Sequence, residues 1–536
     1  MACPPLCNRI LFALAGLTPA CGNSPAGGSD LADTGTSEAA ETHEGPTPGE
    51  ATAGTMGSDP TTSDSLDPDT GADTDGTSGP DDPPPPGGDY PLPPGVGSGP
   101  TVYAAADGDD AQDGLTLETA VRTLDRALEL AEPGSIIEVG GGEYEGFMVS
   151  DGEFGTEDQW ILMRPLDGED VTITSSGDGP TIYFYADACD EDNGLVDGNC
   201  THAFVRLEGL RVQGSPNGGG DGNAIKIDTP RVQLVNNRLC CSVADVIKNV
   251  RTADDTVIYG NEIYQDPAIV TPGDNAQGID ITGADRLQVV GNYLHDLTDI
   301  AAYAKGNSRE VVFEGNLIAD TGKGGEGNAI MCGQSTDADR LVDGDYETYD
   351  CMVRNNVIAH VAGACVAVGS SRGARVYNNT CFDTATMIHA ALMLTNESEV
   401  GQPSTDVEFR GNIVAQSSSS RVFTDTEDLG MTDWSTLVVG DNLYFAEDGA
   451  PLFTLNASGL YDGGDAAAWN AALSDLTGHG DASTIADPKF VDTTRLEPSA
   501  GSPAVDAMPC LVGYDFDGLS RPSDGEVCDI GAIELD

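Results

Sequence analysis

One short sequence unit recurs eight times between Phe204 and Tyr444, and it limits the possible folds of this chain more than any other feature. Each unit has a few alternating apolar residues, then Asn, one free position and an apolar residue, as in VQLVNNRL, TVIYGNEI, LQVVGNYL and VVFEGNLI. A repeated unit with variable insertions is typical of solenoid proteins. The eight Asn residues, 23 to 40 positions apart, are Asn237, Asn261, Asn292, Asn316, Asn356, Asn379, Asn412 and Asn442.

The local pattern of the unit selects the kind of solenoid. The apolar run before each Asn alternates as in a half-buried strand, and a second strand such as NAIKID or QGIDIT follows in each coil. Asn tolerates the left-handed backbone and bonds neighbouring backbone groups, so each X-Asn pair predicts a sharp turn. Stacked coils would align these amides into a buried ladder. We therefore predict an all-β right-handed parallel β-helix.

The first 99 residues precede the repeats and have a different composition. Residues 1–21 predict an export signal, because Arg9 precedes the short apolar run ILFALAGL. The run ends at TPACGNS, which resembles a bacterial lipoprotein signal with Cys21 as the lipidated residue, and plain secretion is the alternative. Residues 22–99 are Gly, Ser, Thr, Asp, Glu and Pro with few apolar residues, which predicts a disordered acidic linker.

The repeats are flanked by segments that we expect to close the two ends of the stack. LETAVRTLDRALELA places Val121, Leu124, Leu128 and Ala131 on one face, which predicts an amphipathic helix over residues 118–131. Such a helix would cover the exposed strand edges of the first coil. We assign residues 100–460 to the β-helix with this N-terminal cap, and residues 461–536 to a C-terminal closing segment.

The chain from about residue 100 to 536 resembles the pectate-lyase-type superfamily of exported right-handed β-helix proteins. The opening segment YAAADGDDAQDGLTLETAVRTLDRALELAEPGSIIEVGGGEYEG and the closing segment SPAVDAMPCLVGYDFDGLSRPSDGEVCDIGAIELD carry this resemblance beside the repeats. The closing segment contains the D-x-x-G-x-x-R and DIGA-x-E motifs of such proteins. These motifs indicate the fold and do not identify a reaction.

Charge and cysteine content narrow the partners and the compartment. The chain has 24 basic and 89 acidic residues, a net charge of −65, which opposes nucleic-acid binding. Without Cys3, Cys7 and Cys21, ten of 13 cysteines remain, an even number that favours disulfides in an exported protein. We expect three pairs that each close a loop insertion, although the sequence does not prove pairing: Cys189–Cys200, Cys332–Cys351 and Cys510–Cys528.

Three of the five lysines fall in the second strands of neighbouring coils. When these strands are aligned by their inward apolar residues, four outward residues fall in line on successive coils, and Lys305 follows at the next outward position. At ~4.8 Å per coil they would form one patch. We call this set the lysine strip; it comprises Lys226, Lys248, Asp280, Tyr303 and Lys305.

The resemblance to β-helix polysaccharide lyases implies a chemistry for the lysine strip. In such lyases a Lys or Arg removes the C5 proton of a uronate, and Ca²⁺ commonly neutralises the substrate carboxylate. Here Asp221-Gly-Asn-Ala-Ile-Lys226 resembles a pectate-lyase word, and Lys305-Gly-Asn-Ser resembles the base-bearing word of chondroitinase/alginate-type lyases. Neighbouring Lys226 and Lys248 would lower each other's pKa, Tyr303 would protonate the leaving oxygen, and the candidate Ca²⁺ ligands are Asp221, Asp228 and Asp280.

Two classes of function remain open. One is a lyase or C5-epimerase acting on an acidic (uronate) polysaccharide along the lysine strip. The other is a non-catalytic surface protein that binds glycans or has a structural role. In both, we expect a protein at the cell surface or anchored to the outer membrane by its lipid, or alternatively secreted. His295-Asp296 at a coil corner is a further acid/base candidate, for which a surface turn is the simpler reading.

Overall fold

The computed structural model describes one unit within residues 88–535. The predicted signal 1–21 with Cys21, residues 22–87 of the predicted linker, and most of the loop 188–198 lie outside the described residues. Short internal stretches are also excluded from the description: 187–188, 190–199, 274, 323–326, 337–340, 342–343, 396–401, 419, 426–429, 456–460, 492, 494 and 523–525.

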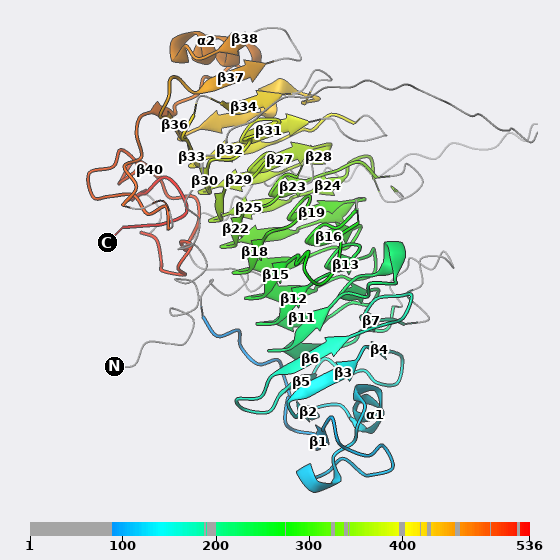
Figure 1. The fold of residues 1–536 in the computed structure, drawn as a ribbon. Coiled ribbons are helices and arrows are strands. Elements are labelled where there is room, and N and C mark those ends of the chain that lie inside the picture. Colours follow the sequence, from blue (N-terminus) through cyan, green and yellow to red (C-terminus); the bar gives the residue numbers. More distant parts are fainter. Residues whose placement is uncertain are drawn as a thin grey trace, which may run out of the picture. The chain divides into compact units, whose positions relative to one another are not determined.

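Three sheets of 12 strands each build this unit (Figure 1). The first sheet contains β1 (Thr101–Ala104), β2 (Ile136–Val139), β5 (Ile161–Pro165), β8 (Val205–Glu208), β11 (Val232–Val235), β14 (Val257–Tyr259), β17 (Gln288–Val290), β21 (Val312–Glu314), β25 (Met352–Arg354), β29 (Arg375–Tyr377), β32 (Glu408–Arg410) and β35 (Val438–Gly440). The second sheet contains β3 (Gly142–Glu145), β6 (Val171–Thr174), β9 (Arg211–Gln213), β12 (Arg238–Cys240), β15 (Glu262–Tyr264), β18 (Tyr293–His295), β22 (Leu317–Ala319), β26 (Val357–Ala359), β30 (Thr380–Phe382), β33 (Ile413–Gln416), β36 (Leu443–Ala446) and β39 (Thr484–Ile485). The third sheet contains β4 (Phe147–Val149), β7 (Ile182–Phe184), β10 (Ile225–Ile227), β13 (Ile247–Asn249), β16 (Ile279–Thr282), β19 (Ala302–Lys305), β23 (Ile330–Cys332), β27 (Val366–Gly369), β31 (Leu392–Thr395), β34 (Arg421–Asp425), β37 (Leu452–Leu455) and β38 (Tyr461–Gly463).

The order of the strands is that of a parallel β-helix. From β8 to β37 the chain visits the first, second and third sheets in turn, and each strand pairs in parallel with its counterpart one coil away, as β10 does with β13. Short extra strands β20 (Ser308–Arg309), β24 (Thr348–Tyr349) and β28 (Ser371–Arg372) form a small sheet of their own. The predicted fold class is confirmed.

The Asn ladder lies at the turn between the first and second sheets and is built as predicted. Asn261 shows the recurring arrangement: its side-chain nitrogen donates to Leu234 O at 2.9 Å and to Asn292 Oδ1 at 3.0 Å. Its backbone N–H donates to the same Asn292 oxygen at 2.9 Å. All eight amides are at most 2% exposed, so the ladder satisfies polar groups that the stacked coils bury.

The residue before each ladder Asn, rather than the Asn itself, adopts the left-handed conformation. This position has φ between +52° and +67° in all eight coils and carries only Gly, Asn or Asp. These are the residue types that tolerate positive φ at least cost. The eight residues are Asn236, Gly260, Gly291, Gly315, Asn355, Asn378, Gly411 and Asp441.

The N-terminal cap differs from the single predicted helix. A 3-10 helix η3 (Leu117–Thr119) and a short helix α1 (Leu124–Leu130) replace it, because Val121 between them pairs with strand β1. The backbone N–H of Val121 donates to Tyr103 O at 2.9 Å, and the Thr123 side chain then caps α1. The predicted inward residues Val121, Leu124 and Leu128 are nonetheless buried, and α1 lies beside β1 and β4 (Figure 1).

The last residues of the predicted linker are part of the folded unit. Tyr259 in β14 donates its hydroxyl to Gly88 O at 2.9 Å, and its ring lies 4.9 Å from that of Tyr90. The buried Arg206 donates to Pro91 O at 2.8 Å. Residues from 88 onward thus pack on the first sheet, because Tyr90 gives this Pro-rich stretch an aromatic contact.

The closing segment contributes a second helix and a return path along the stack. Helix α2 (Ala466–Thr477), which the sequence pattern did not reveal, buries Trp469 against Phe453 with ring centres 4.7 Å apart. The strands β40 (Met508–Pro509) and β41 (Val527–Cys528) follow, and Asn378 donates to Asp529 O at 3.1 Å. The other 3-10 helices among the described residues are η6 (Gly219–Asp221) and η8 (Trp434–Thr436). No described helix has the length and apolar character that a membrane span requires.

Five disulfides are present in the described residues. The pairs Cys189–Cys200, Cys332–Cys351 and Cys510–Cys528 are those expected from the sequence. Two further pairs were not expected: Cys365–Cys381 and Cys240–Cys241. The last joins adjacent residues, which spacing rules for loop-closing disulfides do not suggest.

Candidate functional site

The third sheet brings the lysine strip together in the predicted register. Lys226, Lys248, Asp280 and Tyr303 are directly paired on the successive strands β10, β13, β16 and β19. Lys305 pairs with Thr282 in the next outward position. The alternation works because the flanking isoleucines point into the fully buried core, which directs the residues between them outward.

Lys226 lies at one end of the strip and is loosely paired. Its side chain is 22% exposed, and its ammonium lies 3.8 Å from Asp221 and 3.9 Å from Asp228. It also lies 5.3 Å from the ring centre of Tyr183, whose hydroxyl donates to Asp228. Both carboxylate distances exceed direct hydrogen-bond range, so the ammonium can take another acceptor.

Lys248 is held between two buried carboxylates. Its ammonium donates to Asp280 and lies 3.6 Å from Asp245, and both acids are at most 2% exposed. Burial lowers the pKa of Lys248, but the charges of Asp280 and Asp245 outweigh burial and raise it above its ordinary value. The expectation that neighbouring lysines lower this pKa is therefore wrong, because the acids are closer partners than the second ammonium.

The two acids titrate in opposite directions although both are buried. Burial and the charge of Asp280 raise the pKa of Asp245 to about 7, against the attraction of Lys248. Burial also acts to raise the pKa of Asp280, but Lys248 and Lys305 hold it below its ordinary value. Lys248 and Asp280 therefore form the fixed ion pair, and Asp245 is the group that takes up a proton near neutral pH.

Tyr303 and Lys305 form the other end of the strip. Tyr303 is 1% exposed and donates its hydroxyl to Gln277 Oε1 at 3.0 Å. Burial, followed by the charge of Asp280, raises the pKa of Tyr303 well above its ordinary value. The ammonium of Lys305 lies 5.0 Å from the centre of the Tyr303 ring, and within the described chain no carboxylate comes within 4 Å of it.

This arrangement bears on each predicted role. The Tyr303 hydroxyl is enclosed, so the geometry does not favour it as a proton donor to a polymer lying on the surface. Lys248 remains an ammonium at neutral pH and is better suited to binding an anion than to abstracting a proton. Lys305 is the member of the strip whose nitrogen is least engaged by acids.

The residues do not fit the expected Ca²⁺ site. Asp221 and Asp228 lie against Lys226, and Asp280 lies against Lys248, so each of the three candidate ligands is already near an ammonium. In the part of the chain that the structure describes, no group of three or more His, Cys, Asp or Glu side chains is arranged to hold a metal ion. Ca²⁺ requires several oxygen ligands around one point, and these side chains do not provide them.

Two site residues escaped the sequence reading. Asp245 lies two positions before β13, where the direction of a side chain depends on the turn and not on strand alternation. Tyr183 extends the strip by one coil, since it pairs with Lys226. Its strand IYF carries the same apolar alternation as IKI, so this residue could have been found by extending the alignment one coil earlier.

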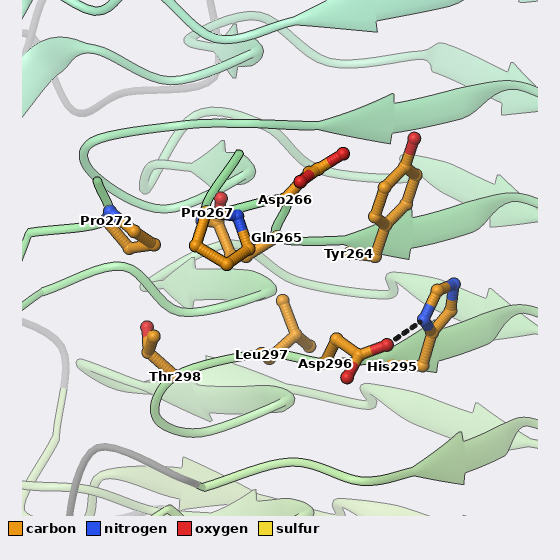
Figure 2. Close-up of a pocket in the computed structure, with 9 residues that line it drawn as sticks. All are labelled: Tyr264, Gln265, Asp266, Pro267, Pro272, His295, Asp296, Leu297 and Thr298. Atoms are coloured by element: carbon orange, nitrogen blue, oxygen red, sulfur yellow. Dashed lines mark hydrogen bonds and ion pairs between the residues drawn. The ribbon is translucent and has the colours of Figure 1, made fainter. Parts of the chain in front are cut away.

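The His295–Asp296 pair is separate from the lysine strip. His295 ends β18 in the second sheet, and its Nδ1 lies 3.0 Å from Asp296 Oδ2. Both residues line a pocket of about 520 Å³ at the ends of β15 and β18 (Figure 2). The structure thus contains a second polar site that belongs to another sheet.

A protein-family model agrees with the observed fold. Residues 223–412 match the family model described as "Right handed beta helix region", and no curated protein matches the chain. Among solved structures, pectate lyase Pel9A is similar at 13% identity, with 81% of this chain and 96% of that chain covered and a TM-score of 0.49. PfbA, a surface adhesin of Streptococcus pneumoniae, is similar at 11% identity, with 60% and 81% covered and a TM-score of 0.40. With its three parallel sheets and this match across residues 223–412, the protein is a right-handed parallel β-helix.

Proposed function

We propose that this protein is exported and binds an acidic polysaccharide along the third sheet. The observation that carries the proposal is the gathering of Lys226, Lys248 and Lys305 on neighbouring coils of one sheet. The whole chain has only 24 basic residues against 89 acidic ones, so three lysines on neighbouring coils of one sheet are a local exception. Ammonium groups at coil spacing suit a polymer that carries a carboxylate on each sugar.

The three lysines differ in their role in this proposal. Lys226 is only loosely paired with Asp221 and Asp228, at 3.8 and 3.9 Å, and Lys305 lies over the Tyr303 ring, so these two ammonium groups are the proposed contacts to the polymer. Lys248 is 25% exposed, but its charge is neutralised by Asp280, so it is not a proposed contact to the polymer. Protonation of Asp245 on mild acidification would remove a second negative charge near Lys248 and make the centre of the strip less negative.

Export rests on two observations. Residues 1–21 have the pattern of a signal with a lipidated Cys21, and five disulfides occur in the described unit. Disulfides persist in oxidising compartments and are rare in the cytosol. A lipid at Cys21 would hold the protein at the outer membrane, with residues 22–87 between the lipid and the β-helix.

A binding panel tests the proposal. Oligogalacturonides, oligoalginates and glycosaminoglycan fragments are titrated against the wild type and the variants Lys226→Ala and Lys305→Ala. Each substitution should weaken binding of the preferred polymer about 3- to 5-fold, as expected for one partly exposed ion pair. Lys489→Ala is the matched control, because Lys489 is exposed and donates to Gly501 O in the closing segment. Equal affinity in all four proteins would refute the assignment.

An elimination reaction is the second candidate, and it is favoured by the free position of Lys305. As an amine, Lys305 would take the C5 proton of a bound uronate, the C4–O bond would break, and the leaving oxygen would take a proton from water. The products are one fragment with a 4,5-unsaturated uronate at its non-reducing end and one fragment with a new reducing end. Ultraviolet absorbance of the unsaturated product detects this reaction, and its loss in Lys305→Ala but not in Lys489→Ala would assign the base.

A further inference from the structure

A pocket on the second sheet is distinct from the lysine strip. It has a volume of about 520 Å³, within the range of small-ligand sites, and it lies where the chain leaves β15 and β18 (Figure 2). No lysine or arginine is among its lining residues, which are Tyr264, Gln265, Asp266, Pro267, Pro272, His295, Asp296, Leu297 and Thr298.

One wall of the pocket is a rigid stack of rings. Tyr264 and His295 are paired across β15 and β18, and their rings are 5.0 Å apart and nearly parallel, at 3°. Tyr293 stacks on His295 at 4.3 Å. The His295 ring is further fixed by Asp296 at 3.0 Å and by Glu262 at 3.4 Å. Because Tyr264 and Tyr293 pack against the His295 ring, this side of the pocket is rigid.

The opposite wall is a loop tied to the Cys240–Cys241 disulfide. Val270 in this loop is buried against both cysteines, and the Gly273 N–H donates to Val243 O at 3.0 Å. Pro267 and Pro272 from the same loop line the pocket. The disulfide of adjacent cysteines therefore anchors the loop whose prolines give the pocket an apolar side.

A buried amide at the base of the pocket has an unused donor. Gln265 is 2% exposed, and its Oε1 accepts the backbone N–H of Ser242 at 3.1 Å. That bond fixes the orientation of the amide, and its Nε2 has no hydrogen-bond partner among the described residues. A buried donor without an acceptor is unfavourable, so a ligand oxygen that accepts from this nitrogen would gain binding energy.

We propose that this pocket binds a neutral sugar residue of a glycan. The Gln265 amide supplies a donor for a sugar oxygen, and the carboxylates of Asp266 and Asp296 supply acceptors for sugar hydroxyls. Pro267 and Pro272 would contact the apolar face of the sugar ring. Because Asp266 and Asp296 line the pocket and no lysine or arginine does, the carboxylate of a uronate would be repelled. This ligand therefore differs from the acidic polymer of the lysine strip.

The test uses neutral cello-, manno-, galacto- and xylo-oligosaccharides, with oligogalacturonides as the acidic reference. Saturation-transfer NMR identifies a bound oligosaccharide, and calorimetry gives its affinity for the wild type and two variants. Gln265→Met removes the buried donor at similar volume and should weaken neutral-sugar binding about 5- to 10-fold. Asp296→Asn should weaken it about 5-fold, and it is expected to fold because Asn accepts the φ of +52° at this exposed turn.

Asp506→Asn is the matched control, since Asp506 is also exposed with positive φ and lies in the closing segment. Oligogalacturonide affinity, where present, should be unchanged in both pocket variants. The proposal is overturned if no neutral oligosaccharide binds, or if Asp296→Asn and folded Gln265→Met bind it like the wild type. It is also overturned if the pocket variants lose oligogalacturonide binding, because the pocket would then belong to the acidic-polymer site.

Discussion

At the scale of single residues, the three lysines of the strip differ in charge environment because different carboxylates lie near each ammonium group. Lys248 is paired with two buried carboxylates, and Lys226 lies 3.8 and 3.9 Å from two others. The ammonium of Lys305 instead lies over the ring of Tyr303. Strand alternation puts all three lysines on one face together with Asp280 of β16, whereas Asp221, Asp228 and Asp245 lie beside the strands. The charge state of the strip is therefore set both by its own Asp280 and by acids outside its strands.

The raised pKa of Asp245 predicts a specific pH dependence of stability. Its pKa rises from an ordinary value near 3.8 to about 7 in the folded protein, so the folded state binds more protons than the unfolded state in that window. This contribution to stability is present at low pH and is lost as pH rises toward about 7. Asp245→Asn has no carboxyl proton to lose. The free energy of unfolding of this variant, relative to that of the wild type, should therefore increase by more than about 1 kcal/mol between about pH 5 and about pH 8.

Denaturant unfolding of both proteins across this pH range measures the difference. Asp406→Asn is the control, because Asp406 is an exposed acid paired with Arg375 on another part of the stack. A stability difference between Asp245→Asn and wild type that stays constant with pH would contradict the account of this buried acid.

At the scale of elements, the Asn ladder is the feature that fixes coil register. Asn292 donates its side-chain N–H groups to Ile258 O of the preceding coil and to Asn316 of the next coil, so removing this amide leaves donors and acceptors unpaired on both sides. Asn292→Ala should cost about 1–3 kcal/mol of unfolding free energy. Asn217 is exposed and makes one hydrogen bond, to Ser176 O. Asn217→Ala should therefore change the free energy of unfolding by no more than about 0.5 kcal/mol.

Thermal and denaturant unfolding of these two variants compares a buried with an exposed amide of the same chemistry. A clear loss of stability for Asn292→Ala alone is the expected result. Equal stability of both variants would mean that the ladder does not contribute to coil stacking.

The elements also show which features a sequence can predict. The ladder and the register of the lysine strip follow from residue alternation, so Asn292 and Lys248 were placed correctly. The N-terminal helix was predicted too long, because its 3.6-residue pattern did not reveal that Val121 pairs with β1. Local periodicity does not report a tertiary backbone contact.

Turns and non-local contacts explain the remaining misses. Asp245 and Gln265 become important through burial and through partners in other coils, which no local pattern encodes. The Cys240–Cys241 bond joins neighbours, whereas sequence reasoning looks for pairs that close a loop. The pocket arises from two loops of adjacent coils, so it exists only once the coils are stacked.

At the scale of the whole molecule, the N-terminal region is expected to connect the β-helix to a membrane. The described residues begin at 88, where the chain lies on the first sheet through contacts of Tyr90 and Pro91 with Tyr259 and Arg206. If Cys21 is lipidated, the mature N-terminal peptide will carry diacylglycerol on its sulfur, and the protein will partition with the membrane fraction. Mass spectrometry of that peptide measures the modification directly.

Cys21→Ser should release the protein to the soluble fraction without changing the folding of the β-helix. A mature N-terminus elsewhere than Cys21, or membrane association that persists in Cys21→Ser, would contradict the proposed anchor. Glycan binding by the two proteins should be equal, because the lysine strip lies on the third sheet.

The salt dependence of acidic-polysaccharide binding tests the central claim most directly. The affinity for the preferred polyuronate is measured over a range of NaCl concentrations for wild type, Lys226→Ala/Lys305→Ala and Lys489→Ala. If the lysine strip binds the polymer, wild-type affinity will fall steeply with salt, and the double variant will bind about 10-fold or more weakly with a shallower slope. Lys489→Ala should follow the wild type. A double variant with wild-type affinity and an unchanged slope would show that the lysine strip does not bind the polymer.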